Sequence, residues 1–62
     1  MNEPIKPLAF SPPDAAVRLG ISLRGIYLLI ATGDLRSAKI GKRRLIPDTE
    51  LQDYLKRKLK EN

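Results

Sequence analysis

Apolar residues recur at the spacing of one helix face in the middle of the chain. The stripe consists of Ile26, Leu29 and Ile30, at positions i, i+3 and i+4. Ser22 suits an N-cap and Gly33 a C-cap, so the pattern predicts a helix of about three turns between them. Its apolar side must face a core. The side turned away from that core presents Arg24, Tyr27, Leu28 and Ala31.

A shorter helix is predicted just before it. Ser11 is followed three residues later by Asp14, an arrangement that caps a helix start, and Gly20 provides the stop. The residues expected to face inward are Ala15, Ala16, Leu19 and, from the turn, Ile21. A small residue in the first helix and a glycine in the turn are typical of a helix-turn-helix, whose second helix enters the major groove of DNA. The alternative is a helical hairpin that only packs.

After Gly33 the pattern changes to alternation. Residues 37–40 and 44–46 are predicted to form two short strands joined by a turn at residues 41–43, with Pro47 after the second strand. The residues expected to face the core are Ala38, Ile40 and one of Leu45 or Ile46. The exposed basic tip at Lys42 and Arg43 would be a wing that contacts phosphates or the minor groove. The alternative is an edge ribbon that Lys and Arg keep soluble.

A second helical stripe follows near the end of the sequence. It consists of Leu51, Tyr54, Leu55 and Leu59, at i, i+3, i+4 and i+8. Asp48 is the expected N-cap, and Asp53 and Arg57 form an expected i, i+4 ion pair. We expect this helix to cover the core as a lid. Its basic last turn is explained equally by the helix dipole and by a second phosphate contact.

The order of these elements predicts a single domain within 62 residues. The expected fold class is mainly α with a small β-hairpin, a winged helix-turn-helix of order α-turn-α-β-β-α. Residues 10–60 are expected to form this DNA-binding domain. Residues 1–9 contain Pro4 and Pro7 and show no periodicity, so we expect a flexible N-terminal arm there.

Charge and composition narrow the function. The 12 Lys and Arg residues outnumber the 7 Asp and Glu residues, and the net charge of +5 favours a polyanionic partner. One stretch without any acid holds the cations Arg36, Lys39, Lys42, Arg43 and Arg44. The chain has no Cys and no His, which removes disulfides, zinc sites of the usual ligand types, and thiol or imidazole catalysis. We therefore expect no metal, no cofactor, no small-molecule substrate and no enzymatic activity.

The sequence also bears on location. It contains no secretion signal pattern and no apolar run of about 20 residues, the length that crosses a bilayer. We therefore expect no membrane association and a cytoplasmic, nucleoid-associated protein.

The candidate DNA contacts combine the exposed helix face with the basic ribbon. They are Ser22, Leu23, Arg24, Tyr27, Leu28, Arg36, Lys39, Lys42, Arg43 and Arg44. Arg24 is expected to contact a base edge, and the Tyr27 hydroxyl to contact a phosphate. Backbone N–H groups near Ser22 are expected to meet another phosphate. Leu28 is expected to meet either a thymine methyl group or a neighbouring protein.

Three segments together resemble the excisionase-like branch of the MerR-like winged helix-turn-helix proteins. They are FSPPDAAVRLGIS (residues 10–22), IYLLIATGDL (residues 26–35) and AKIGKRRLIPDTELQDYL (residues 38–55). The passage IGKRRLIP followed by an amphipathic helix is the most specific part. Two positions depart from the family pattern. Leu28 stands where these proteins often have a basic residue, and Gly25 where Thr or Ser is common.

The resemblance implies a small bacterial, phage, plasmid or integrated-element protein that binds and often bends double-stranded DNA. It implies DNA contacts at Arg24, Tyr27, Lys42 and Arg43. Proteins of this kind assist excision as recombination directionality factors with an integrase, or they regulate transcription. Both roles stay open, and the expected partners besides DNA are an integrase and neighbouring copies of the protein.

Two further alternatives are a protein-interaction adaptor and an RNA-binding module. An adaptor would use the same fold with its basic face as a solubilising surface. The RNA-binding alternative is weaker, because Phe10, Tyr27 and Tyr54 are too scattered to form a stacking platform.

Overall fold

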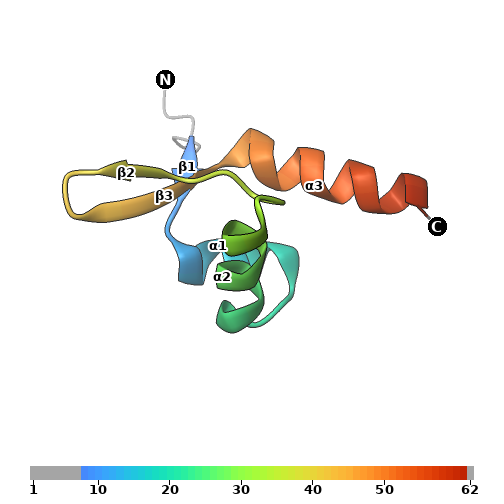
Figure 1. Cartoon of the computed structure of the whole chain (residues 1–62), viewed down its shortest axis with the longest axis horizontal. Coiled ribbons are helices and arrows are strands. Elements are labelled where there is room, and N and C mark those ends of the chain that lie inside the picture. The colour runs from blue at the N-terminus through green and yellow to red at the C-terminus, as the bar shows by residue number, and fades with distance from the viewer. Residues whose placement is uncertain (1–7, 62) are drawn as a thin grey trace, which may run out of the picture.

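The computed structural model describes residues 8–61. Its elements are β1 (Ala9–Phe10), α1 (Pro12–Leu19), α2 (Leu23–Thr32), β2 (Ala38–Ile40), β3 (Arg43–Pro47) and α3 (Asp48–Glu61). Two short helices, a hairpin and a closing helix follow in the expected order (Figure 1), which confirms the winged helix-turn-helix fold. Residues 1–7 of the expected arm lie outside the described residues. Ala9, also assigned to that arm, belongs to strand β1.

The helix ends agree with the predicted capping residues. Ser11 and Ser22 precede α1 and α2 with extended backbones, and each hydroxyl accepts a hydrogen bond from the N–H three residues on, at 3.4 and 3.1 Å. Gly20 and Gly33 end the same helices with φ of 75° and 88°, in the left-handed region that glycine enters freely. Local sequence therefore sets both helix lengths.

The turn between α1 and α2 sets the two helices at a steep angle. The Gly20 N–H donates to the carbonyls of Ala16 and Val17, at 2.8 and 3.2 Å, and the Ile21 N–H donates to that of Ala16 at 3.0 Å. The helix direction changes by 103° across this turn, within the range typical of a helix-turn-helix. Ala15 and Ala16 are buried, and their small side chains allow α2 to approach closely.

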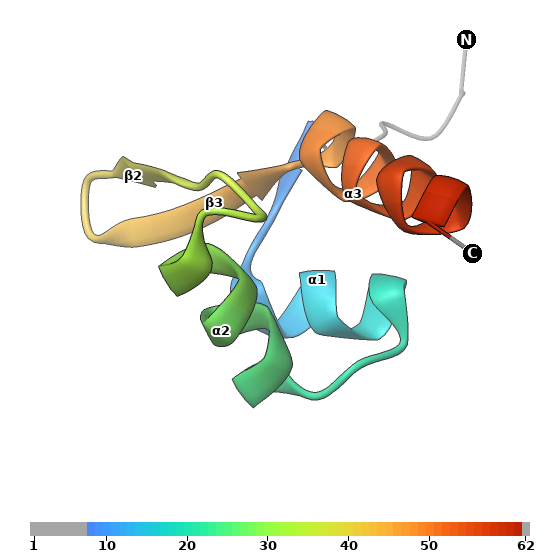
Figure 2. The ribbon, with the colours of Figure 1, turned by 45° about the vertical axis from the view of Figure 1, so that its right-hand side comes forward.

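Strand β3 is the centre of a three-stranded antiparallel sheet of order β1-β3-β2. Phe10 in β1 pairs with Ile46 near the end of β3, and Lys39 in β2 pairs with Arg44 near its beginning. Strand β1 was not predicted, because a two-residue strand has no alternation to detect. The β2–β3 hairpin projects from the body of the domain (Figures 1 and 2).

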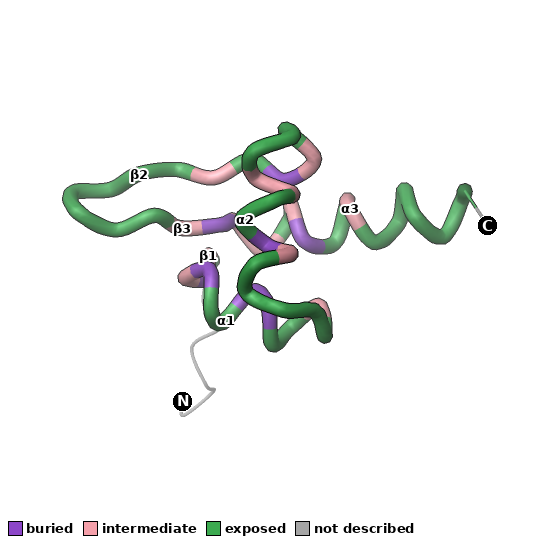
Figure 3. Tube along the Cα trace, turned by 60° about the horizontal axis from the view of Figure 1, so that its bottom comes forward, coloured by how far each residue is buried: buried purple, intermediate pink, exposed green. Residues whose placement is uncertain are grey.

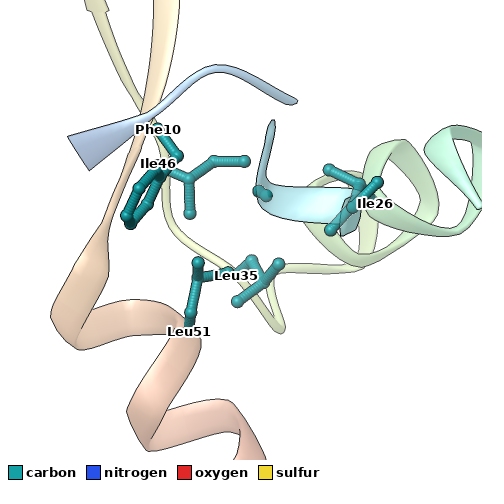
Figure 4. Packing of buried hydrophobic residues seen from close by; sticks show 7 residues of the cluster. Phe10, Ile26, Leu35, Ile46 and Leu51 are labelled. Carbon is teal, nitrogen blue, oxygen red and sulfur yellow. The ribbon is translucent and has the colours of Figure 1, made fainter. Parts of the chain in front are cut away.

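The core lies where the two short helices, the sheet and the start of α3 meet (Figure 4). It consists of the buried residues Phe10, Ala15, Ala16, Ile26, Leu35, Ile46 and Leu51. The partly buried residues packed against it are Leu19, Leu29, Ile30 and Tyr54. Figure 3 shows the buried positions gathered at the centre, with the hairpin tip and the last turns of α3 exposed. The predicted apolar stripe of α2 does face this core.

Of the hairpin residues expected to face the core, Ile46 is confirmed, whereas the prediction is wrong for Ala38 and Ile40. Ala38 is exposed and Ile40 is 63% exposed, whereas Ile46 is fully buried. Ile46 and Arg44 share one face of β3, and Arg44 pairs with Lys39, so this basic pair lies on the core side of the sheet. The two-residue turn of Gly41 and Lys42 fixes the register between β2 and β3, and burial of Ile46 fixes which face of β3 is turned toward the core.

Helix α3 covers the core with its first half only. Leu51 is buried and Tyr54 partly buried, but Leu55 and Leu59 are 51% and 66% exposed. The C-terminal part of α3 extends away from the helices α1 and α2, as Figure 1 shows. The predicted lid is therefore wrong for the last two turns, because the small core ends before the helix does.

Two polar roles predicted for α3 differ in the structure. Asp48 is the first residue of the helix, and its carboxylate accepts a hydrogen bond from the Gln52 side chain at 2.7 Å. The Arg57 guanidinium donates to the carbonyl of Asp34 at 2.7 Å. No ion pair joins Arg57 to Asp53 within residues 8–61.

Candidate nucleic-acid interface

Helix α2 presents the predicted side chains on the side away from the core. Ile26 is fully buried, whereas Tyr27 is 50% and Leu28 is 56% exposed, and Arg24 is also exposed. A helix packed on one side and free on the other can lie in a major groove, where its N-terminal side chains reach base edges. The predicted exposure is confirmed, and contact of these residues with DNA stays a prediction.

Ile21 adds exposed apolar surface at the start of α2, and this exposure was not predicted from the sequence. It was expected inside but is exposed, with its side chain over Gly25. A Cβ atom added at Gly25 would lie 3.3 Å from Ile21 Cδ1 and 3.4 Å from Ser22 Oγ. The missing side chain at Gly25 therefore lets Ile21 pack on the first turn of α2. A glycine inside a helix, which is intrinsically destabilising, was the signal for this close approach.

The β2–β3 hairpin carries four exposed cations, Lys39, Lys42, Arg43 and Arg44. Lys39 and Arg44 are paired on the core side of the sheet, and Arg43 begins β3 on the opposite side. Lys42 lies in the turn, where Gly41 has φ of 63°. Arg43 was predicted in the turn and instead begins the strand. The four cations nevertheless lie together on one projecting ribbon, which has the charge and shape of a wing.

The connector, defined as residues 33–37, joins α2 to β2 and is held by α3. The Arg36 N–H donates to Glu50 Oε1 at 2.9 Å, and Arg57 Nη2 donates to the Asp34 carbonyl at 2.7 Å. Between these two bonds the Leu35 side chain is buried in the core.

Arg36 has different surroundings from the other predicted cations. It lines an open groove of about 490 Å³ between the connector and α3. Other residues lining this groove are the acids Asp34, Glu50 and Asp53 and the cations Lys56, Arg57 and Lys60. Arg36 therefore lies beside carboxylates, whereas the hairpin cation Arg44 donates from Nη1 to Ser37 Oγ at 2.7 Å, next to Arg36 in the connector.

The basic end of α3 makes contacts of its own. Lys58 Nζ lies 3.3 Å from Glu61 Oε1, and the hydrogen bond and negative charge of Glu61 raise the pKa of Lys58 above its ordinary value. The cationic groups of Arg57 and Lys58 lie 5.8 and 5.6 Å from the centre of the Tyr54 ring. Arg57 and Lys58 therefore already have partners within the protein. A phosphate contact by the last turn of α3 stays a prediction.

The fold and this surface together define a winged helix-turn-helix, which is a class of DNA-binding domain. Comparison with known proteins agrees. A family model described as a helix-turn-helix domain matches residues 9–59. The chain therefore belongs to this family of helix-turn-helix domains, and its sequence is excisionase-like.

The excisionase-like character comes from a relative. A probable excisionase of Saccharopolyspora erythraea is 41% identical over 44 residues, which cover 71% of this chain and 45% of that protein. The chain thus matches less than half the length of this curated relative. No solved structure matches the chain. The resemblance stated from the sequence is confirmed at the level of the family.

Among residues 8–61, no group of three or more acidic side chains is placed to hold a metal ion. No single helix there is long and apolar enough to cross a membrane, and α1 and α2 meet that test only as a pair bent by 103°.

Proposed function

We propose that this protein binds and bends specific DNA sites of a phage or other mobile element, and acts as an excisionase with an integrase. One observation carries the proposal. In a chain similar to a probable excisionase, the exposed face of α2 and a projecting ribbon of four cations belong to one small domain. Both are surfaces suited to a DNA duplex.

Helix α2 lies in the major groove in this proposal. Arg24, near the N-terminal end, donates two hydrogen bonds to a guanine edge, the commonest specific contact of arginine with DNA. The half-exposed Tyr27 packs its ring on the helix and donates its hydroxyl to a phosphate. The exposed Ile21 offers apolar surface to thymine methyl groups. These contacts select the sequence.

The hairpin supplies the sequence-independent part of the binding. Lys42 and Arg43 reach the phosphates or the minor groove beside the site of α2, and Lys39 and Arg44 add positive field on the core side of the sheet. A duplex held at the helix and again at a wing that projects from the body gains contacts by bending toward the protein. The bend is the architectural contribution to excision, and the integrase performs the strand exchange.

A single module of this size binds DNA weakly and with moderate selectivity. Specificity therefore comes from repeated sites, where neighbouring copies or an integrase raise the effective concentration. Leu23 and Leu28 on the exposed face are candidates for contact with a neighbouring copy.

The experiment uses circularly permuted fragments of the attachment site nearest to the gene for this chain. In a gel-shift assay, we expect one retarded band whose mobility depends on the position of the site within the fragment. In a recombination assay with the integrase, we expect excision to require this protein. Equal affinity for a shuffled sequence at low salt would refute specific binding. Specific binding to a promoter without any effect on excision would instead favour the role of a transcriptional regulator.

A further inference from the structure

The recognition helix and the wing are joined by the short connector. Helix α2 packs mainly on α1, whereas β2 packs on β3. The five residues 33–37 lead directly from the end of α2 to the start of β2. Strand β3 is anchored independently, because it packs on α1 and leads directly into α3. Looseness in this connector would therefore act on β2, the strand of the wing that follows α2.

Helix α3 restrains the connector through two side chains. Glu50 Oε1 accepts a hydrogen bond from the Arg36 N–H at 2.9 Å, two residues before β2 begins. Arg57 Nη2 donates to the Asp34 carbonyl at 2.7 Å, one residue after the C-cap of α2. Glu50 and Arg57 are seven residues apart, so two turns of one helix face contact the same segment.

The negative charge of Glu50 allows a positioning role to be distinguished from a purely electrostatic effect on DNA binding. An acid beside a DNA-binding surface weakens binding through simple electrostatics, so removing it should strengthen the complex. Asp53 lines the same groove, and among residues 8–61 no group donates a hydrogen bond to its carboxylate. Of these two acids, only Glu50 bonds to the backbone of the connector.

We propose that Glu50 and Arg57 are positioning residues that hold the wing in a fixed position relative to the recognition helix. Helix α3 then supports the DNA-binding surface, although neither side chain needs to contact the duplex. This inference rests on the proposed DNA-binding function. Because the connector is already fixed in the free protein, the wing loses less conformational entropy when it binds phosphates.

The test compares Glu50→Ala with Glu50→Gln, because both raise the net charge from +5 to +6. Glutamine keeps a side-chain oxygen that accepts the Arg36 N–H, and alanine does not. We expect the alanine variant to bind specific duplex about 3- to 10-fold more weakly than the glutamine variant, the effect of one lost hydrogen bond. Asp53→Ala is the control on the same helix, and it should bind at least as tightly as the unmodified protein.

A double-variant cycle separates positioning from general destabilisation. Lys42→Ala should weaken binding less in the Glu50→Ala background than in the Glu50→Gln background, because the displaced wing already contributes less. Thermal unfolding of each variant shows that binding is measured on folded protein. Equal affinity of the alanine and glutamine variants, or an unchanged effect of Lys42→Ala, would overturn the inference while leaving the proposed function intact. An unmodified protein that binds no duplex would overturn both.

Discussion

Neutralising the wing should change the salt dependence of DNA binding by a predictable amount. Five exposed cations lie on α2 and the hairpin: Arg24, Lys39, Lys42, Arg43 and Arg44. If each neutralises one phosphate, the slope of log K against log salt concentration is about −4.5. Affinity should then fall about 500-fold between 50 and 200 mM salt. Arg36 is left out of the count because it faces the groove beside α3.

The double variant Lys42→Gln with Arg43→Gln removes two of these contacts. The slope should become about −2.7, and the same change of salt should weaken binding only about 40-fold. The matched control is Lys56→Gln with Lys60→Gln, which lowers the net charge equally, from +5 to +3, on exposed positions of α3. Its slope should stay near −4.5.

Fluorescence anisotropy of a labelled duplex, titrated at several salt concentrations, measures both slopes. If the two double variants lose affinity and slope equally, net charge alone governs binding and the hairpin has no special role. If only the α3 variant changes the slope, the phosphate contacts lie on the helix rather than on the wing. Either result would refute the assignment of the hairpin as a wing that contacts DNA.

Three further substitutions test single positions. Arg24→Ala should lose about 1–3 kcal/mol and relax base preference at one position of the site, measured with single base-pair variants of the duplex; equal loss on every sequence would contradict base contact. Ile26→Ala should lower the free energy of unfolding by about 2–5 kcal/mol, because Ile26 is fully buried. This is a large share of the roughly 3–9 kcal/mol expected for 62 residues. An unchanged midpoint of urea unfolding would contradict the core assignment. Leu28→Ala should keep both stability and single-site affinity but lose cooperativity on repeated sites, and unchanged cooperativity would count against contact with a neighbouring copy.

The helices and the exposed face of α2 could be predicted because their signals are local. A capping hydroxyl at Ser22 bonds an N–H only three residues away, and Gly33 ends the helix by its own conformation. Once those ends are known, helical period alone puts Arg24 and Tyr27 on the side opposite Ile26. These predictions needed no knowledge of the rest of the molecule.

The errors concern residues whose surroundings come from distant parts of the chain. Ile40 is as apolar as any core residue, but the hairpin extends beyond the core and the side chain is exposed. Leu55 and Leu59 continue a regular stripe, but the body of the protein ends beside Leu51 and Tyr54. Periodicity identifies an apolar stripe and carries no information about whether a partner surface reaches along it.

The sequence by itself determined the class of this domain: where its helices start and stop, and which cations stand in one run between residues 36 and 44. Tertiary structure decided how those cations are distributed. Burial of Ile46 decides which face of β3 is turned toward the core, and the pairing of β2 with β3 puts Lys39 and Arg44 on that face. The hydrogen bond from the Arg36 backbone to Glu50 places Arg36 in the groove beside α3, among acidic residues. The physical reason is that capping and helical period act within a few residues, whereas strand pairing and burial depend on segments that meet only after the chain has folded.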